Sequence, residues 1–203
     1  MELITQTCLD DLKLTGYTYL AYRTLVNDLL TQNQSTGTDH STKMLEYTRL
    51  NVQRMNKWDK RIELNQDLIR LAKKMTNEQL WVVLTEGWCG DAAQNLPVIN
   101  KVAQQNDKIK LKLLLRDQHP DLMDEYLTNG ARSIPKLIVY DKSTGSKLFE
   151  WGPRPKPIQD LLYQIKNNLD FSYEQFALQT HTWYAKDKGN TLQKELLALL
   201  KSI

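Results

Sequence analysis

A short apolar run followed at once by a cysteine between glycines constrains the fold of this chain more than any other stretch. Residues 80–84 read Leu-Trp-Val-Val-Leu, which is the length of a buried strand and too short to cross a membrane. Residues 87–90 follow as Gly-Trp-Cys-Gly, and apolar residues then recur at helical spacing over residues 92–103. The sequence therefore predicts that Cys89 lies where a buried strand passes into the N-terminus of a helix.

This position has opposing effects on the cysteine thiol. Unpaired amide groups and the positive end of the helix dipole favour a thiolate at Cys89, whereas the carboxylate of Asp91 disfavours one. We expect a nucleophile that attacks disulfides or is oxidised to a sulfenic acid, and that is alkylated faster than a free cysteine peptide. The alternative is an unreactive, buried thiol inherited with the fold.

Residues 88–92, Trp-Cys-Gly-Asp-Ala, resemble the active-site turn of the thioredoxin family, whose pattern is Trp-Cys-x-x-Cys. Pro97 resembles the kinking proline of the same helix in that family. Residues 131–140 resemble the strand that begins with a cis-proline opposite the cysteine, and Gly152 resembles the glycine that closes the last strand. The resemblance covers about residues 77–168 and is to bacterial thioredoxin-family proteins with helical extensions.

Two departures from the family pattern change the expected chemistry. Ala92 replaces the second cysteine of the motif, and Val83 replaces a buried acid six positions before the first. Cys89 therefore cannot close a disulfide within the motif, and ordinary dithiol reduction is not expected. Glu86 is the nearest acid in sequence, but strand alternation could equally direct it to solvent. Cys8, the other cysteine, is interpreted as a bystander rather than as a distant resolving thiol.

The resemblance assigns roles to two stretches that are far apart in the chain. Cys89 is the expected catalytic residue, and Trp88 is expected to shield one side of its sulfur. In the family, the backbone before the cis-proline pairs with the substrate chain, so Ile134 is expected to supply that backbone. The alternative for Pro135 is an ordinary trans proline at the start of a strand. The residues expected to shape the site are Trp88, Gly90, Asp91, Ala92, Ile134 and Pro135, and those expected to bind substrate are Trp88, Ile134 and Pro135.

We predict an α/β chain with a thioredoxin-like fold, in which helices flank a central mixed sheet and extra helices lie at both ends. Residues 1–76 form an N-terminal helical extension packed on the core, residues 77–168 the core, and residues 169–203 a C-terminal helical extension. The core order βαβαββα lacks an obvious first strand. Either the N-terminal helices replace that strand, or a short strand near residues 60–64 is hidden. The apolar face of a last helix over residues 191–201 must be covered by this chain or by a second copy.

Composition excludes several other classes of protein. The formal charge of +3 is spread evenly, which argues against a nucleic-acid partner. Basic residues between Lys43 and Arg61 alternate with acidic and apolar ones, which favours a solvated helix face over a polyanion site. The three histidines lack ligand spacing, and no phosphate or dinucleotide fingerprint is present, so we expect no metal and no cofactor. No membrane segment or secretory leader is recognisable, and two distant cysteines form no disulfide framework, so we expect a cytoplasmic protein.

The sequence therefore predicts a thiol–disulfide oxidoreductase of cell redox homeostasis that acts through one cysteine. Its partners are a protein or small-thiol disulfide substrate and an external resolving thiol, with no membrane partner and with a homodimer through the terminal helices. The alternative is a redox-inactive binding module that binds a protein partner near Trp88 and Ile134. A third interpretation, a peroxide-reducing cysteine, needs polar groups around the sulfur that the sequence does not provide.

Overall fold

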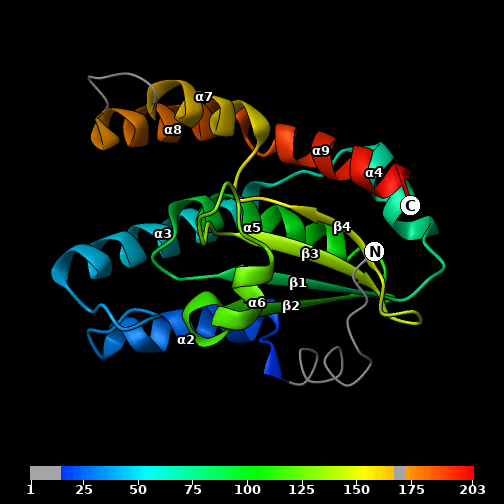
Figure 1. Cartoon of the computed structure of the whole chain (residues 1–203), viewed down its shortest axis with the longest axis horizontal. Coiled ribbons are helices and arrows are strands. Elements are labelled where there is room, and N and C mark those ends of the chain that lie inside the picture. Colours follow the sequence, from blue (N-terminus) through cyan, green and yellow to red (C-terminus); the bar gives the residue numbers. More distant parts are fainter. Residues whose placement is uncertain (1–14, 167–171) are drawn as a thin grey trace.

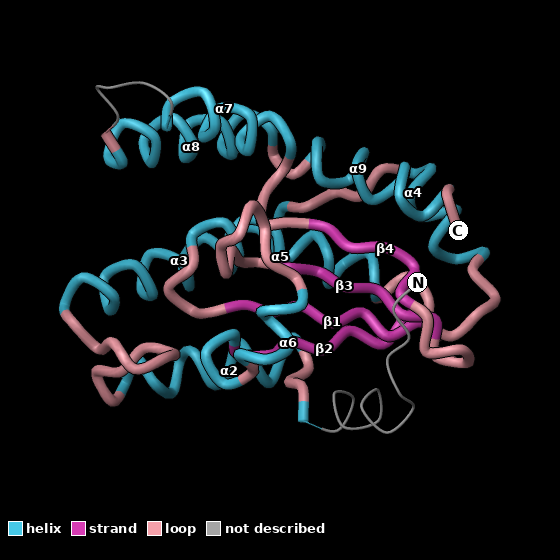
Figure 2. The backbone as a smooth tube through the Cα atoms, viewed as in Figure 1, coloured by secondary structure: helices cyan, strands magenta, loops and turns pink. Residues whose placement is uncertain are grey.

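The computed structural model describes residues 15–166 and 172–203, and a four-stranded mixed sheet lies at its centre (Figures 1 and 2). The strand order is β2-β1-β3-β4. The parallel pair is β1 and β2, and β3 runs antiparallel to both β1 and β4. The bounds are Gln79–Thr85 for β1, Ile109–Leu115 for β2, Lys136–Asp141 for β3 and Lys147–Trp151 for β4. The mixed sheet flanked by helices is the predicted architecture.

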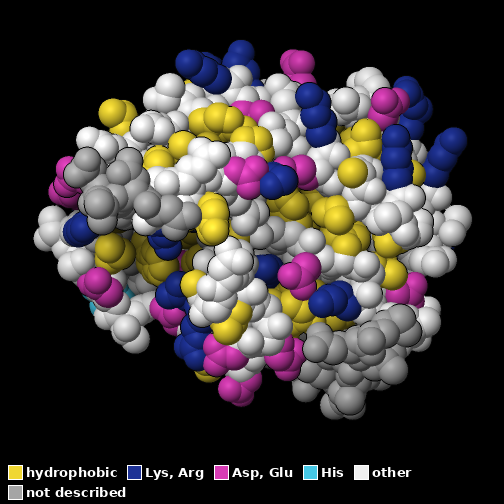
Figure 3. Space-filling view, turned by 45° about the horizontal axis from the view of Figure 1, so that its top comes forward, with side chains coloured by type: hydrophobic (Ala, Val, Ile, Leu, Met, Phe, Trp, Pro, Cys, Tyr) yellow, Lys and Arg dark blue, Asp and Glu magenta, His cyan; other side chains and the backbone are white. Residues whose placement is uncertain are grey.

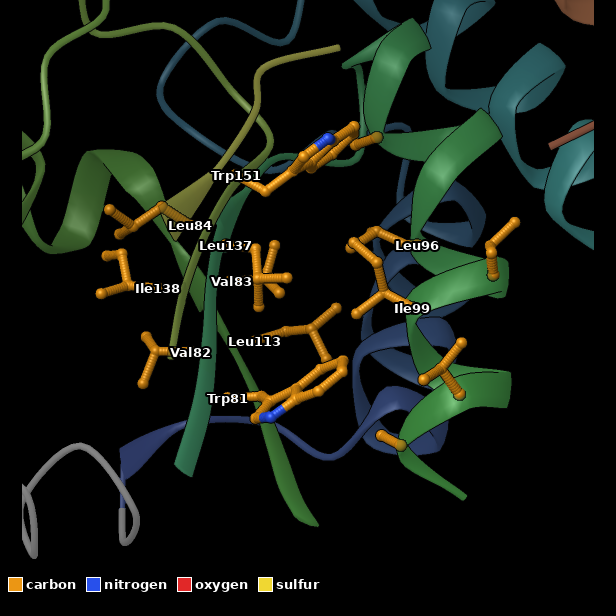
Figure 4. Close-up of a cluster of buried hydrophobic side chains, with 14 of the residues drawn as sticks. Trp81, Val82, Val83, Leu84, Leu96, Ile99, Leu113, Leu137, Ile138 and Trp151 are labelled. Carbon is orange, nitrogen blue, oxygen red and sulfur yellow. The ribbon is translucent and has the colours of Figure 1, made fainter. Parts of the chain in front are cut away.

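Strand β1 is buried along its whole length because helices cover both faces of the sheet. Figure 4 shows Trp81 and Val83 pointing toward helix α5 (Gly90–Ala103), where they meet Leu96 and Ile99. Val82 and Leu84 point to the opposite side together with Ile138. Alternation along the strand therefore supplies two apolar layers, as expected for a central strand that is buried at every position.

Eight α-helices are described around the sheet, together with a short 3-10 turn at Arg116–Gln118. Helix α3 packs along α5, and α4 packs against α9. Ser41 and Asn65 cap α3 and α4, because each side chain accepts a hydrogen bond from a backbone amide in the first turn of its helix. The helix bounds are Tyr19–Thr31 for α2, Thr42–Arg61 for α3, Gln66–Lys74 for α4, Gly90–Ala103 for α5, Pro120–Glu125 for α6, Lys156–Lys166 for α7, Tyr173–Asp187 for α8 and Asn190–Lys201 for α9.

The hidden strand considered near residues 60–64 is wrong. Helix α3 continues to Arg61, and Ile62 serves as its C-cap. At the free edge of β2, Tyr17 instead forms an antiparallel bridge with Leu113 through two backbone hydrogen bonds of 2.8 Å. A single bridge followed by α2 thus occupies this edge in the described part of the chain.

The C-terminal helix α9 is covered within the same chain. Leu192, Leu196 and Leu200 are buried on its inner face, which contacts α4 and α5. Gln193 is also buried, and its side chain accepts a hydrogen bond from the Asn65 amide at 2.7 Å.

Figure 3 shows basic and acidic side chains interspersed over one face of the molecule. None of the described helices combines the length and apolarity needed to cross a bilayer.

Candidate active site

Cys89 lies at the corner between β1 and α5, where it is the N-cap residue of the helix. Its Sγ accepts a hydrogen bond from the Ala92 amide at 3.4 Å. The residue is only 7% exposed, and Ala92 is buried beside it. Gly90 leaves room for the guanidinium of Arg54, which would lie 3.4 Å from an added Cβ. The sequence thus correctly placed the thiol at the strand-to-helix corner.

The cysteine meets the predicted second stretch across the site. The Sγ–H group of Cys89 donates to the carbonyl oxygen of Ile134 at 3.3 Å. The Ile134–Pro135 peptide bond is cis and directly precedes β3. No described residue accepts a hydrogen bond from the Ile134 amide. Residues 45 positions apart in sequence are thereby brought into contact at the reacting atom.

The resting thiol is not activated, contrary to the expectation from the helix dipole. Burial, and after it the nearby Asp91 carboxylate, raise the pKa of the Cys89 thiol to about 12. The Ala92 amide and the Arg154 guanidinium lower this pKa without offsetting the burial. Removal of the sulfur from water disfavours the charged form more strongly than a few helix amides favour it. This raised pKa argues against the expectation that Cys89 is alkylated faster than a free cysteine peptide in the resting site.

We expect a pH dependence that follows from this raised pKa. Only the thiolate reacts with iodoacetamide, so alkylation of Cys89 at neutral pH should be at least about a hundredfold slower than for a free cysteine peptide with a pKa of about 8.5. The rate should still rise about tenfold per pH unit at pH 10. Mass spectrometry of the peptide containing Cys89 measures it, while circular dichroism confirms that the chain stays folded. A plateau below pH 9 would contradict this prediction.

Asp91 is held by residues from the C-terminal third of the chain. The Arg154 guanidinium forms an ion pair with Oδ2 at 2.6 Å through one nitrogen and donates from Nε at 2.8 Å. The Tyr184 hydroxyl donates to Oδ1 at 2.7 Å, and Asn95 in turn donates to the Tyr184 oxygen at 3.0 Å. Burial, together with the Asp91 carboxylate, raises the pKa of Tyr184. The carboxylate beside the sulfur is therefore fixed in place and balanced by one cation.

Helix α3 and the loop before it hold the turn that carries the cysteine. Asn51 donates to the Gly87 carbonyl at 3.0 Å, and the Gly87 amide donates to Thr36 Oγ1 at 2.8 Å. Arg54 lies 2.9 Å from both Asn51 Oδ1 and His181 Nε2. Burial lowers the pKa of His181, and the Arg54 charge lowers it further, so a neutral imidazole that accepts from Arg54 is favoured. The N-terminal helices thus contribute directly to the site.

Trp88 and Glu86 flank the turn on another side. The Trp88 ring stacks with the Arg116 guanidinium, whose carbon lies 5.0 Å from the ring centroid. Glu86 is fully buried, so the considered orientation toward solvent is wrong. Its Oε1 accepts from the Asp117 amide at 3.0 Å, and burial raises the pKa of this carboxyl group. Glu86 thus fixes the turn after β2, and no hydrogen bond between described residues joins it to the Cys89 thiol.

A cavity of about 710 Å³ opens beside Cys89 between α3 and α8. Trp88, Ile134 and Asp91 line it, as do Arg54, Arg154 and Tyr184. The sequence alone did not identify the last three residues as part of a site. Arg154 could have been noticed between the two prolines that follow Gly152, but Arg54 and Tyr184 belong to ordinary helical patterns. No group of three or more potential metal ligands occurs within residues 15–166 and 172–203, and Cys8 lies outside the described residues.

The sequence is similar to thioredoxins. A family model described as thioredoxin matches residues 37–169, beginning in the loop before α3. Two relatives, each called Thioredoxin 1, come from Synechococcus elongatus and from a Nostoc species. They are 35% and 37% identical to this chain over 54 residues, which is 26% of this chain and 48% of either relative. The chain therefore spans about half the length of the curated relatives it matches.

Solved structures resemble almost the whole chain in fold. A protein of unknown function from Pseudomonas aeruginosa has a TM-score of 0.60 at 16% identity, and the match covers 98% of both chains. An HIV epitope-scaffold has a TM-score of 0.59 at 16% identity, covering 96% of this chain and 98% of the scaffold. At this level of identity the similarity concerns the fold, including the helices before and after the sheet.

Proposed function

Because the chain belongs to the thioredoxin family, we propose that it exchanges thiols and disulfides through Cys89 as its single reacting sulfur. The observation that carries this proposal is the position of Cys89, which caps α5, lies 3.3 Å from the Ile134 carbonyl and lines a cavity. A substrate disulfide in that cavity would lie next to Cys89, which is one of the lining residues. The external thiol that completes the cycle is abundant in a reducing cytoplasm, where we place the activity.

The exchange has two steps, and each conserves the number of disulfide bonds. In the first, the Cys89 thiolate attacks a substrate disulfide, so that a bond forms from Sγ to one substrate sulfur and the substrate S–S bond breaks. Cys89 first releases its thiol proton to water, and the departing substrate thiolate takes up a proton from water, so that the protons balance. In the second step, an external thiolate attacks the substrate sulfur of the mixed disulfide. Cys89 leaves as a thiolate and takes up a proton, while the external thiol and the substrate sulfur become joined.

Substrate binding provides the activation that the resting site lacks. The Cys89 proton is held by the Ile134 carbonyl, and the Ile134 amide has no partner among the described residues. An extended substrate backbone that pairs with Ile134 donates its own amide to the Ile134 carbonyl and displaces the Cys89 thiol from this acceptor. The protonated thiol then loses a stabilising contact, so its pKa falls on binding.

A second function is favoured by the same raised pKa. A thiol that is 7% exposed and has a pKa of about 12 also suits a chain that binds its partner without redox chemistry. In that case the cavity walls near Trp88 and Ile134 form the binding surface. Binding that survives Cys89→Ser, with no mixed disulfide in the wild type, would favour this second function.

Single-turnover product release distinguishes the two functions. The wild type is mixed with an asymmetric disulfide peptide without external thiol, and products are counted by mass spectrometry. We expect one free thiol product per Cys89 and a mixed disulfide with the other half, whereas Cys89→Ser should give only background exchange. Ala92→Cys should release both halves, because the added thiol can resolve the mixed disulfide. Equal product from wild type and Cys89→Ser would overturn the proposed function, and the double variant Cys89→Ser, Ala92→Cys serves as control.

A further inference from the structure

We infer that the cavity beside Cys89 takes a small anionic disulfide, or the corresponding thiol, that carries carboxylate groups near its sulfur. This inference rests on the proposed function and names the substrate class of the same site. It follows from three properties of the cavity, namely its excess of positive charge, its buried and unpartnered hydroxyl group, and its size.

The charged residues around the cavity are strongly unbalanced. Asp91 is its one acidic lining residue among those described, and Arg154 balances that charge through a close ion pair. This excess is local, because basic and acidic side chains are interspersed on the face shown in Figure 3. The basic side chains that line the cavity are Lys43, Arg54, Arg116, Arg132, Arg154 and Lys166.

Not all of these cations have a carboxylate partner. Arg116 pairs with Asp117 at 2.8 Å, and Arg132 pairs with Asp124 at 2.6 Å. Arg54 forms no ion pair with a described residue: its hydrogen-bond partners are the neutral groups Asn51 and His181, and the Asp91 carboxylate, which is paired with Arg154, acts on it only from a longer distance. Burial lowers the pKa of Arg54, which indicates a guanidinium partly removed from water. A carboxylate placed next to it would gain a charge-assisted hydrogen bond in a site of reduced polarity.

A hydroxyl group and apolar walls complete the site. Thr180 is 7% exposed and lines the cavity, yet its Oγ1 has no hydrogen-bond partner. A buried hydroxyl without a partner is unfavourable, so a ligand oxygen at this position would satisfy it. Met44, Leu162 and Phe176 add apolar surface between the polar groups. This combination suits short methylene segments between a sulfur and a terminal carboxylate.

The size of the cavity argues for a small molecule. Its volume of about 710 Å³ lies within the range of sites for small ligands, roughly 300–1,000 Å³. The cationic residues come from α3, α7 and the loops around β2, β3 and β4, so they surround the ligand rather than forming a flat surface. We therefore infer a low-molecular-weight compound and treat preference for an acidic protein segment as an outcome that would overturn the inference.

The test compares three disulfides of similar length that differ in charge. These are 3,3′-dithiodipropionate, which is dianionic, bis(2-hydroxyethyl) disulfide, which is neutral, and cystamine, which is dicationic. Mixed-disulfide formation at Cys89 is measured by mass spectrometry, and each rate is divided by that of a free cysteine peptide. We expect the dianion to react at least about tenfold faster than the dication at low salt, and the difference to shrink at high ionic strength.

Matched variants assign the preference to the cavity. Lys43→Gln together with Arg54→Gln should reduce the preference for the dianion about fivefold or more. Arg49→Gln makes the same change on the exposed side of α3 and should leave the preference unchanged. Lys43→Gln alone is expected to fold normally, because Lys43 is exposed and forms no ion pair with a described residue. It therefore tests the charge effect even if the double variant is unstable. Equal normalised rates for the three disulfides, or a preference for cystamine, would overturn the inference.

A binding measurement separates this inference from the proposed function. Suberate has the length and charge of dithiodipropionate but no sulfur, so its binding does not depend on the reactivity of Cys89. We expect suberate to bind the wild type by calorimetry, and 1,8-octanediamine to show no binding. If no disulfide reacts while suberate binds, the proposed function fails and the anion site stands. If neither suberate nor the dianionic disulfide binds, or an acidic peptide binds and suberate does not, the inference fails.

Discussion

Replacing Asp91 by asparagine is expected to increase the thiolate fraction of Cys89 at neutral pH by about tenfold to a hundredfold. The Asp91 carboxylate raises the pKa of the thiol, because two like charges oppose each other near the helix N-terminus. Asparagine removes that charge and leaves the Arg154 cation beside the sulfur, where a cation favours the thiolate. Both changes lower the pKa of Cys89. Thiolate absorbance and iodoacetamide alkylation as a function of pH measure the effect.

Controls distinguish a charge effect from a general loosening of the site. Asp160→Asn removes an exposed carboxylate that pairs with Lys156 on α7, and it should leave the Cys89 profile unchanged. Arg154→Gln removes the cation and should shift the profile in the opposite direction, to still higher pH. An Asp91→Asn profile identical to that of the wild type, in a chain that remains folded, would contradict this account.

Substituting Gly152 by alanine is expected to lower the free energy of unfolding by about 3–5 kcal/mol. Gly152 has a φ of +125°, a conformation that residues with a Cβ rarely adopt. An added Cβ would lie 2.1 Å from the Pro135 carbonyl oxygen and 3.3 Å from the Lys136 Cα. Both atoms belong to the backbone, so relief requires the chain itself to move. Urea unfolding followed by circular dichroism gives the change in free energy.

Gly130→Ala provides the matched control for this effect. Gly130 also has a positive φ, of +74°, but an added Cβ there meets no atom within 4 Å. Its substitution should therefore cost only about 1 kcal/mol, from backbone conformation alone. Equal losses for the two variants would show that the close approach to Pro135 is unimportant. A larger loss for Gly152→Ala should accompany a change in Cys89 reactivity, because Pro135 directly follows the carbonyl that accepts the Cys89 proton.

Much of the fold could be predicted because its signals are local. The apolar run at residues 80–84 became the central strand, and the helical spacing of apolar residues over 92–103 became α5. The edge of the sheet could not be predicted in the same way. The bridge between Tyr17 and Leu113 involves two backbone hydrogen bonds and no repeating pattern, so no sequence periodicity indicates it.

The candidate site was predictable only along the stretches that carry the motif. Cys89 and Ile134 were identified from the sequence, and their side-chain and backbone atoms do meet. The ion pair between Asp91 and Arg154 joins residues 63 positions apart, and the hydrogen bond from Tyr184 spans 93 positions. Helical patterns on α3 and α8 do not reveal that these helices face one cavity. Such contacts arise from packing, which a local pattern does not encode.

The sequence by itself determined that a single thiol sits at a strand-to-helix corner without a second cysteine in its motif. Tertiary structure alone decided the chemical state of that thiol and the charge of its surroundings. A pKa depends on exposure to water and on distances to charges, and the groups that line the cavity come from residues 43 to 184 of the chain. The helix dipole and the neighbouring residues change the pKa of Cys89 locally, and here the burial produced by the fold outweighs their effect.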